Sequence, residues 1–361
     1  MKKALLNAWP SVISHGEEWQ SVITLELTAL PDKIEFEEVS GDADTSLERG
    51  SGNARGFAAV RDETWKPAYK YSFTLHGVGL VMAPDDILVA DGLIKLVRIQ
   101  PDNPAAPGSR RAHYPAQNPY SPWEAQPTKE YPVQVHVDVV TEYPLCELPN
   151  GKLVQIEQTP GLPATVTFRF SRRPLKELLR GVRIGIDPGH GGRDRGIRGP
   201  VDLTEKYVAL EISLELCRML EASGAHPVIT RTEDEYLPEE ERVKILRAGN
   251  PALCVEIHAS GSDDPLAQVY RLAAKQGCED SQLLLKEIAL ALRERMGITP
   301  ESETLPPRPG LDIPCVRVEP VCLTYFADEA NFRAPLFRKR LAQCIYNGVA
   351  RYLHKLKTQA S

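Results

Sequence analysis

The chain has 361 residues, of which 42% are hydrophobic and 25% charged, and its formal net charge is -6. This length exceeds the ~100–200 residues of one typical domain, so a single small disulfide-stapled module is excluded and two or three domains are expected. The negative charge argues against a nucleic-acid-binding protein, because that class normally presents a basic surface to phosphate groups. No apolar run approaches the ~20 residues that a membrane-spanning helix needs.

The first half of the chain has the alternating pattern that is typical of β-strands. Strands are predicted at residues 21–34, 71–78, 87–97, 133–140 and 165–170. A stretch rich in Pro, Asn, Ser and Gln at about 100–131 shows no periodicity, which is typical of a long loop. We therefore predict a β-rich accessory domain at residues 1–172, followed by a short polar linker at 173–181.

The chain opens with the basic residues of a signal peptide, but the apolar segment that follows is too short. Asn7 and Pro10 interrupt it before it reaches the ~7–15 residues of such a segment. We identify no clear signal peptide, which leaves open a cytoplasmic enzyme, a processed chain, or an export route that the sequence does not reveal.

The second half, residues 182–361, alternates between strand and helix patterns. Strands are predicted at residues 182–186, 227–231, 253–258, 268–273 and 315–319, and helices at 203–222, 239–248, 280–296 and 335–356. Such alternation predicts an α/β domain, an open and mostly parallel sheet with helices on both faces.

Chemically distinctive residues follow the predicted strands at one edge of this sheet. In open α/β sheets the ligand site lies beyond the carboxyl ends of the strands. His190 follows the first strand, His258 ends the third, Glu319 ends the last, and Glu205 begins the helix that returns from that edge. Two imidazoles and a carboxylate with a fourth position open are typical of a catalytic zinc site.

Each of these residues also has a structural interpretation. Glu205 completes the pattern Asp202-Leu-Thr-Glu205, a capping box in which the acid bonds back to the helix N-cap. Glu319 is compatible with a solvent-facing carboxylate at a strand end. Asp187 is a candidate to orient His190 by accepting its second ring proton. Arg231 and Arg242 are interpreted as structural residues that form ion pairs.

The second half, over roughly residues 182–356, resembles the zinc-dependent N-acetylmuramoyl-L-alanine amidases of the amidase-3 family. The resemblance rests on Ile-Gly-Ile-Asp-Pro-Gly-His190-Gly-Gly, Leu-Thr-Glu205-Lys-Tyr-Val-Ala-Leu, Val-Glu-Ile-His258-Ala and Pro-Cys-Val-Arg-Val-Glu319, in this order. It implies one zinc ion per chain, bound by His190, Glu205 and His258, and Glu319 as the catalytic carboxylate. It further implies hydrolysis of the amide between N-acetylmuramic acid and L-Ala of peptidoglycan, in the cell envelope or outside the cell.

The sequence also departs from the family pattern near the site. Glu256 stands where the family usually has Ser, Pro320-Val321 replace a Gly-Phe pair, and residues 299–313 form a short Pro-rich approach to the last strand. Two alternatives therefore stay open: an inactive homologue that regulates or binds the wall, and a zinc hydrolase that acts on another amide. The first half lies outside the resemblance, and by its position it is a candidate to bind the wall or envelope partners.

The seven cysteines do not form a recognisable framework. They contain no C-x-x-C pair and are odd in number, so neither a zinc finger nor a full set of disulfides is indicated. Several lie in apolar runs, where a free Cys behaves as a small hydrophobic residue.

Overall fold

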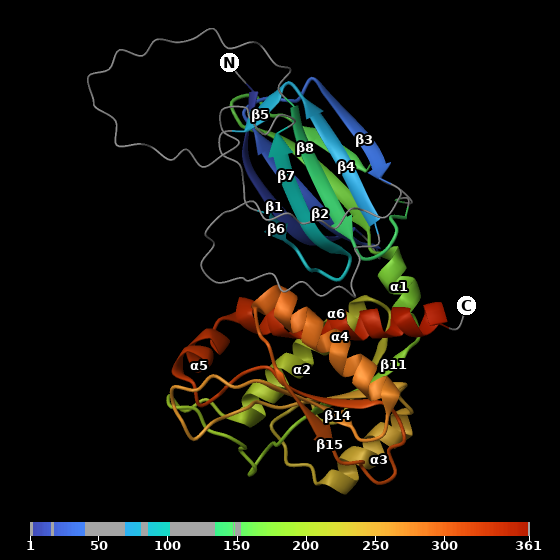
Figure 1. Cartoon of the computed structure of the whole chain (residues 1–361), viewed down its shortest axis with the longest axis vertical. Coiled ribbons are helices and arrows are strands. Elements are labelled where there is room, and N and C mark those ends of the chain that lie inside the picture. Colours follow the sequence, from blue (N-terminus) through green and yellow to red (C-terminus); the bar gives the residue numbers. More distant parts are fainter. Residues whose placement is uncertain are drawn as a thin grey trace, which may run out of the picture. The chain divides into compact units, whose positions relative to one another are not determined.

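The computed structural model of the chain describes residues 3–15, 18–39, 69–80, 86–101, 134–146, 148 and 153–359 (Figure 1). The chain divides into two compact units, Met1–Pro174 and Leu175–Ser361. Most of the loop predicted at about 100–131 lies outside the described residues.

The first unit is built from two five-stranded sheets. One has the order β5-β1-β2-β10-β9, formed by Val78–Leu80, Lys3–His15, Glu18–Leu27, Ala164–Ser171 and Val154–Glu157. The other has the order β3-β4-β8-β7-β6, formed by Lys33–Val39, Tyr69–His76, Gln134–Thr141, Ile94–Pro101 and Ile87–Leu88. The rings of Phe73 and Phe168, one from each sheet, lie 4.1 Å apart and are fully buried. The sheets thus share one apolar core, and the prediction of a mainly β region is confirmed.

Strand β1, which was not predicted, begins at Lys3, shifts its register between Leu5 and Asn7, and continues through Pro10. Pro10 is opposite Ile23 of β2, whereas the short strand β5 pairs with β1 only over Lys3–Leu5. Proline has no N–H to donate to a ladder, so it is tolerated where a strand has a partner on one side only.

The second unit contains one six-stranded sheet with the order β12-β11-β13-β16-β14-β15. Its strands are β11 (Arg183–Pro188), β12 (His226–Ile229), β13 (Leu253–Ile257), β14 (Arg271–Lys275), β15 (Glu301–Leu305) and β16 (Cys315–Glu319). The first four in spatial order are parallel, and β14 runs antiparallel to β16. The prediction of an open, mostly parallel sheet is confirmed.

Helices cover both faces of this sheet. The helices that the structure describes are α1 (Arg173–Leu179), α2 (Glu205–Ala222), α3 (Glu239–Gly249), α4 (Glu279–Met296), α5 (Phe326–Phe332) and α6 (Pro335–Gln359). Figure 1 shows α4 and α6 on one side of the sheet and α3 on the other. Among the described residues, none of the helices combines the length and apolarity needed to cross a bilayer.

Three elements of the linker and the second half were not predicted. Helix α1 occupies most of the expected linker at 173–181 and buries three leucines, Leu175, Leu178 and Leu179. Strand β15 buries only Leu305, so it gives almost no alternating signal. Helix α5 has only seven residues, too few to repeat an apolar period.

All seven cysteines are free thiols, five of them buried and two, Cys146 and Cys278, half-buried. Burial raises the pKa of both Cys217 and Cys344 to about 12, because the thiolate loses hydration. We expect Cys146 and Cys278 to react first with a polar alkylating agent, and the other five only after denaturation. Intact-mass measurements over time test this. Disulfides, or early labelling of all seven thiols, would contradict it.

Candidate metal centre

His190 lies on the turn that follows β11, at the carboxyl edge of the sheet. The turn has an unusual backbone, since His190 has a φ of 58° and Gly191 a φ of 132°. Glycine adopts such conformations at little cost, whereas a residue with a Cβ needs support from its surroundings. Gly189 is required for another reason: a Cβ at this position would lie 2.3 Å from Cε1 of His258. The turn therefore lets the two imidazoles approach each other closely.

Glu205 is the first residue of α2 and does not act as a helix cap. The N-cap is Thr204, which makes no side-chain capping hydrogen bond. The capping-box interpretation, with Asp202 as the N-cap, is therefore wrong. The helix begins two residues later than that pattern requires, and this places the Glu205 side chain inside the site.

The carboxylate of Glu205 is buried and makes four close polar contacts. Its Oε1 lies 2.9 Å from Nδ1 of His258 and accepts a hydrogen bond from the backbone amide of Ala259, and its Oε2 lies 3.0 Å from Nε2 of His190 and accepts one from Ile197. Burial alone would raise the pKa of Glu205, but these contacts outweigh it and hold the pKa well below its ordinary value. Glu205 is therefore ionised, and its contact raises the pKa of His190.

His190, Glu205 and His258 offer ligand atoms that all lie within 4.8 Å of one another. His258 directly follows β13, and its backbone amide donates to the carbonyl of Val318 in β16, which fixes it at the same edge. Gly196 leaves room for the Glu205 carboxylate, because any residue with a Cβ at this position would place that atom 2.5 Å from Oε2. Two imidazoles and one buried carboxylate are a donor set that fits Zn²⁺.

Glu319 is the last residue of β16 and lies beside this cluster. Its side chain is 19% exposed, and Oε2 lies 3.9 Å from Nη1 of Arg271 in the neighbouring strand β14. Burial raises the pKa of Glu319, although the charges of His258, Arg317 and Arg271 oppose the shift. A carboxyl group with a raised pKa is suited to both accepting and returning a proton.

Asp194, and not Asp187, places its carboxylate beside Nδ1 of His190. The prediction that Asp187 accepts the second ring proton of His190 is therefore wrong. Oδ2 of Asp194 lies 2.9 Å from Nδ1 of His190. Asp187 instead accepts hydrogen bonds from Thr230 and Arg242, each at 2.6 Å. Asp187 lies within β11 and its carboxylate is buried. Asp194 follows the turn, which folds the chain so that its carboxylate returns to His190.

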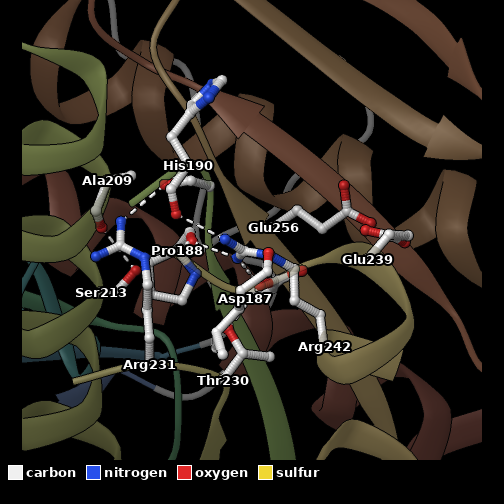
Figure 2. A network of polar contacts seen from close by, with 12 residues as sticks. Asp187, Pro188, His190, Ala209, Ser213, Thr230, Arg231, Glu239, Arg242 and Glu256 are labelled. Atoms are coloured by element: carbon white, nitrogen blue, oxygen red, sulfur yellow. Dashed lines mark hydrogen bonds and ion pairs between the residues drawn. The ribbon is translucent and has the colours of Figure 1, made fainter. Parts of the chain in front are cut away.

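Arg231 and Arg242 hold the backbone of the His190 turn (Figure 2). Arg231 donates to the carbonyl oxygens of Pro188 and Gly189, at 3.1 and 2.7 Å. Arg242 donates to the carbonyl of His190 at 2.6 Å and also forms the expected ion pair with Asp187. Burial and the neighbouring Arg242 lower the pKa of Arg231 to about 10. These two residues thus fix the turn mainly through its carbonyl groups.

Comparisons with known proteins concern the second half of the chain. Residues 184–351 match the family model described as N-acetylmuramoyl-L-alanine amidase. The solved structure of the N-acetylmuramoyl-L-alanine amidase AmiC2 of Nostoc punctiforme is 27% identical, covers 48% of this chain and 97% of that one, and has a TM-score of 0.44.

Three curated relatives match about half of the chain. The amidase LytC of Bacillus subtilis is 29% identical over 49% of this chain and 37% of its own length. The amidase AmiC of Neisseria meningitidis is 28% identical over 52% and 54% of the two chains. YqiI of Bacillus subtilis, an uncharacterised protein, is 30% identical over 49% of this chain and 87% of its own. The chain thus spans only a third to a half of the two named amidases. Through its second half, the chain belongs to the N-acetylmuramoyl-L-alanine amidase family.

Proposed function

We propose that the protein is a zinc-dependent hydrolase that cleaves the amide between N-acetylmuramic acid and L-Ala in peptidoglycan. The observation that carries this proposal is the cluster of His190, Glu205 and His258 at the carboxyl edge of the sheet, with Glu319 beside it. The family match supports the proposed substrate class, and the cluster supports the proposed chemistry. The departures at Glu256 and residues 299–313 leave all four residues in place.

In this proposal some residues of the site bind the metal and another transfers protons. His190, Glu205 and His258 would hold one zinc ion, with Asp194 fixing the ring of His190. Zinc in such a site acidifies a water molecule and polarises the carbonyl of the amide. Glu319 takes a proton from the attacking water and then delivers it to the departing nitrogen. The leaving amine is thus released in its neutral form.

The first unit, which the family model does not cover, is proposed as an accessory domain that localises the enzyme on the wall or on envelope partners. Peptidoglycan lies in the cell envelope. We therefore propose that the whole chain acts there. The proposed accessory domain comprises residues 1–172, before the linker, and the proposed catalytic domain comprises residues 182–361, after it.

We expect one zinc ion per chain, and we expect its binding to require His190, Glu205 and His258. His190→Ala and His258→Ala should each lose most of the zinc in metal analysis after gel filtration. His226→Ala, in an exposed position at the start of β12, is the matched control and should retain it. Glu205→Gln keeps the shape of the side chain but removes its charge, so it should also weaken zinc binding. Stoichiometric zinc in both histidine variants would place the metal elsewhere.

Activity tests the proposal itself. The zinc-loaded protein should solubilise purified peptidoglycan, lose this activity after chelation, and regain it when zinc is added back. A protein that binds peptidoglycan without dissolving it would be an inactive homologue that acts as a regulator or wall-binding module.

A further inference from the structure

A cavity of about 420 Å³ opens beside the metal cluster. Both His190 and His258 line it, and so does the segment Leu305–Pro309, which we call the proline wall. The wall begins at Leu305, the last residue of β15, and continues through Pro306, Pro307 and Pro309. Because proline fixes φ and cannot donate a backbone hydrogen bond, the part beyond Leu305 is stiff and does not extend the strand.

Arg308 anchors the proline wall to the rest of the unit. Its side chain is only 10% exposed, and Nη1 lies 2.7 Å from Oδ2 of Asp187 and 3.1 Å from Oε1 of Glu256. Its Nε donates to Glu239 at the start of α3. One guanidinium therefore joins the wall to two parallel strands and a helix, all close to the site.

Glu256 is the second buried carboxylate that Arg308 contacts. It occupies the position where the resemblance leads one to expect Ser, and it is 2% exposed. A buried carboxylate is costly unless cations compensate it. Arg308 supplies one cation, at Oε1. Arg317 supplies the other, and its Nε and Nη2 donate to Oε2 at 3.1 and 2.9 Å. The unusual Glu256 and the unusual Pro-rich segment are thus one structural unit.

The cavity is lined by exposed charges of both signs. Arg317 is 36% exposed and Glu239 58%, and both line the cavity together with Asp194. Of the two parts of the proposed substrate, the peptide carries carboxylates and amines, whereas an N-acetylated sugar is uncharged. The lining therefore suits the peptide part.

We infer that the proline wall, anchored by Arg308, bounds the subsite for the stem peptide and selects peptides that are not cross-linked to a second peptide. This inference rests on the proposed function. A stiff wall held by buried ion pairs cannot yield to a bulky branch, so cross-linked peptides should be poorer substrates. Arg308 is a positioning residue in this account and does not touch the reacting atoms.

A competition experiment tests the selection. The zinc-loaded full-length protein is given an equimolar mixture of soluble monomeric and cross-linked muropeptides, and mass spectrometry follows the cleavage of each. Arg308→Gln should shift the ratio of the two rates toward the cross-linked substrate by roughly tenfold, the scale on which pocket walls discriminate. Pro307→Gly, which softens the wall without touching its charges, should shift it in the same direction. Arg308→Lys should restore part of the selection.

Lys244→Ala is the control, because Lys244 is an exposed cation on α3 that pairs with Glu241 of the same helix and does not line the cavity. It should leave the ratio unchanged. If both wall variants cleave more slowly with an unchanged ratio, the wall is merely structural and the inference is wrong. If the wild-type protein cleaves neither substrate, the proposed function is wrong. The inferred selection against cross-linked peptides is then wrong as well.

Discussion

Glu319→Gln is expected to lower the turnover of peptidoglycan by a factor on the order of 10²–10⁴, the usual contribution of general acid–base catalysis. Glutamine keeps the size and shape of the side chain but cannot accept the proton of the attacking water. Zinc content should stay the same, since Glu319 lies outside the cluster of three ligands. The measurement is the rate of peptide release by the zinc-loaded variant, together with metal analysis of the same sample.

Glu303→Gln is the matched control for this variant. Glu303 is an exposed carboxylate in β15 that also contacts Arg271, at 3.3 Å. It should keep nearly the full rate. Near-normal turnover in Glu319→Gln would mean that another group is the base. Loss of zinc from it would make Glu319 a ligand or a structural support, and the division of roles proposed above would be wrong.

Asp187→Asn is expected to lower the free energy of unfolding of the second unit by about 3–5 kcal/mol, the usual cost of removing one partner from a buried ion pair. It would leave Arg242 and Arg308 buried without the charge that they share. Denaturant unfolding followed by helix circular dichroism reports on this unit, because the described helices all lie between residues 173 and 359. Tryptophan fluorescence is an internal control, since all four Trp precede residue 175.

This loss of stability should depend on pH with a defined sign. Burial alone would raise the pKa of Asp187, but Arg242 and Arg308 outweigh it and hold the pKa below its ordinary value of 3.8. The carboxylate thus stabilises the fold fully above that value, and this contribution is lost as the pH falls through the lower pKa of the folded state.

The gap in unfolding free energy between wild type and Asp187→Asn should therefore narrow in strong acid. A gap that widens there would contradict the account. Asp312→Asn is the control, because Asp312 is an exposed carboxylate that pairs with Lys275. It should change the free energy of unfolding by no more than about 0.5 kcal/mol, both at neutral pH and in strong acid.

The main features of the site could be predicted from sequence because they depend on strands. Continuous apolar runs mark the buried parallel strands, and the carboxyl ends of such strands meet at one edge. This brings His190 and His258 together although they are far apart in the chain. The start of the helix at Glu205 follows from the same topology.

The residues that were missed depend on turns and on long-range pairing. Asp194 reaches His190 only because three successive residues, 190–192, have positive φ, which no apolar period reveals. Arg308 contacts Glu256 across 52 positions of the sequence, and no local pattern reveals such a long-range pair. In the first unit, residues 21–34 gave one strand pattern, yet the chain turns within it and forms β2 and β3.

The most direct test of the central claim is to identify the products released from purified peptidoglycan by the zinc-loaded protein. Mass spectrometry should find free stem peptides that begin with L-Ala, and glycan strands whose N-acetylmuramic acid carries a free lactyl carboxylate. Products that are cut at any other bond, or no products from a protein that holds its full zinc, would contradict the assignment of this site to the muramoyl-L-alanine amide.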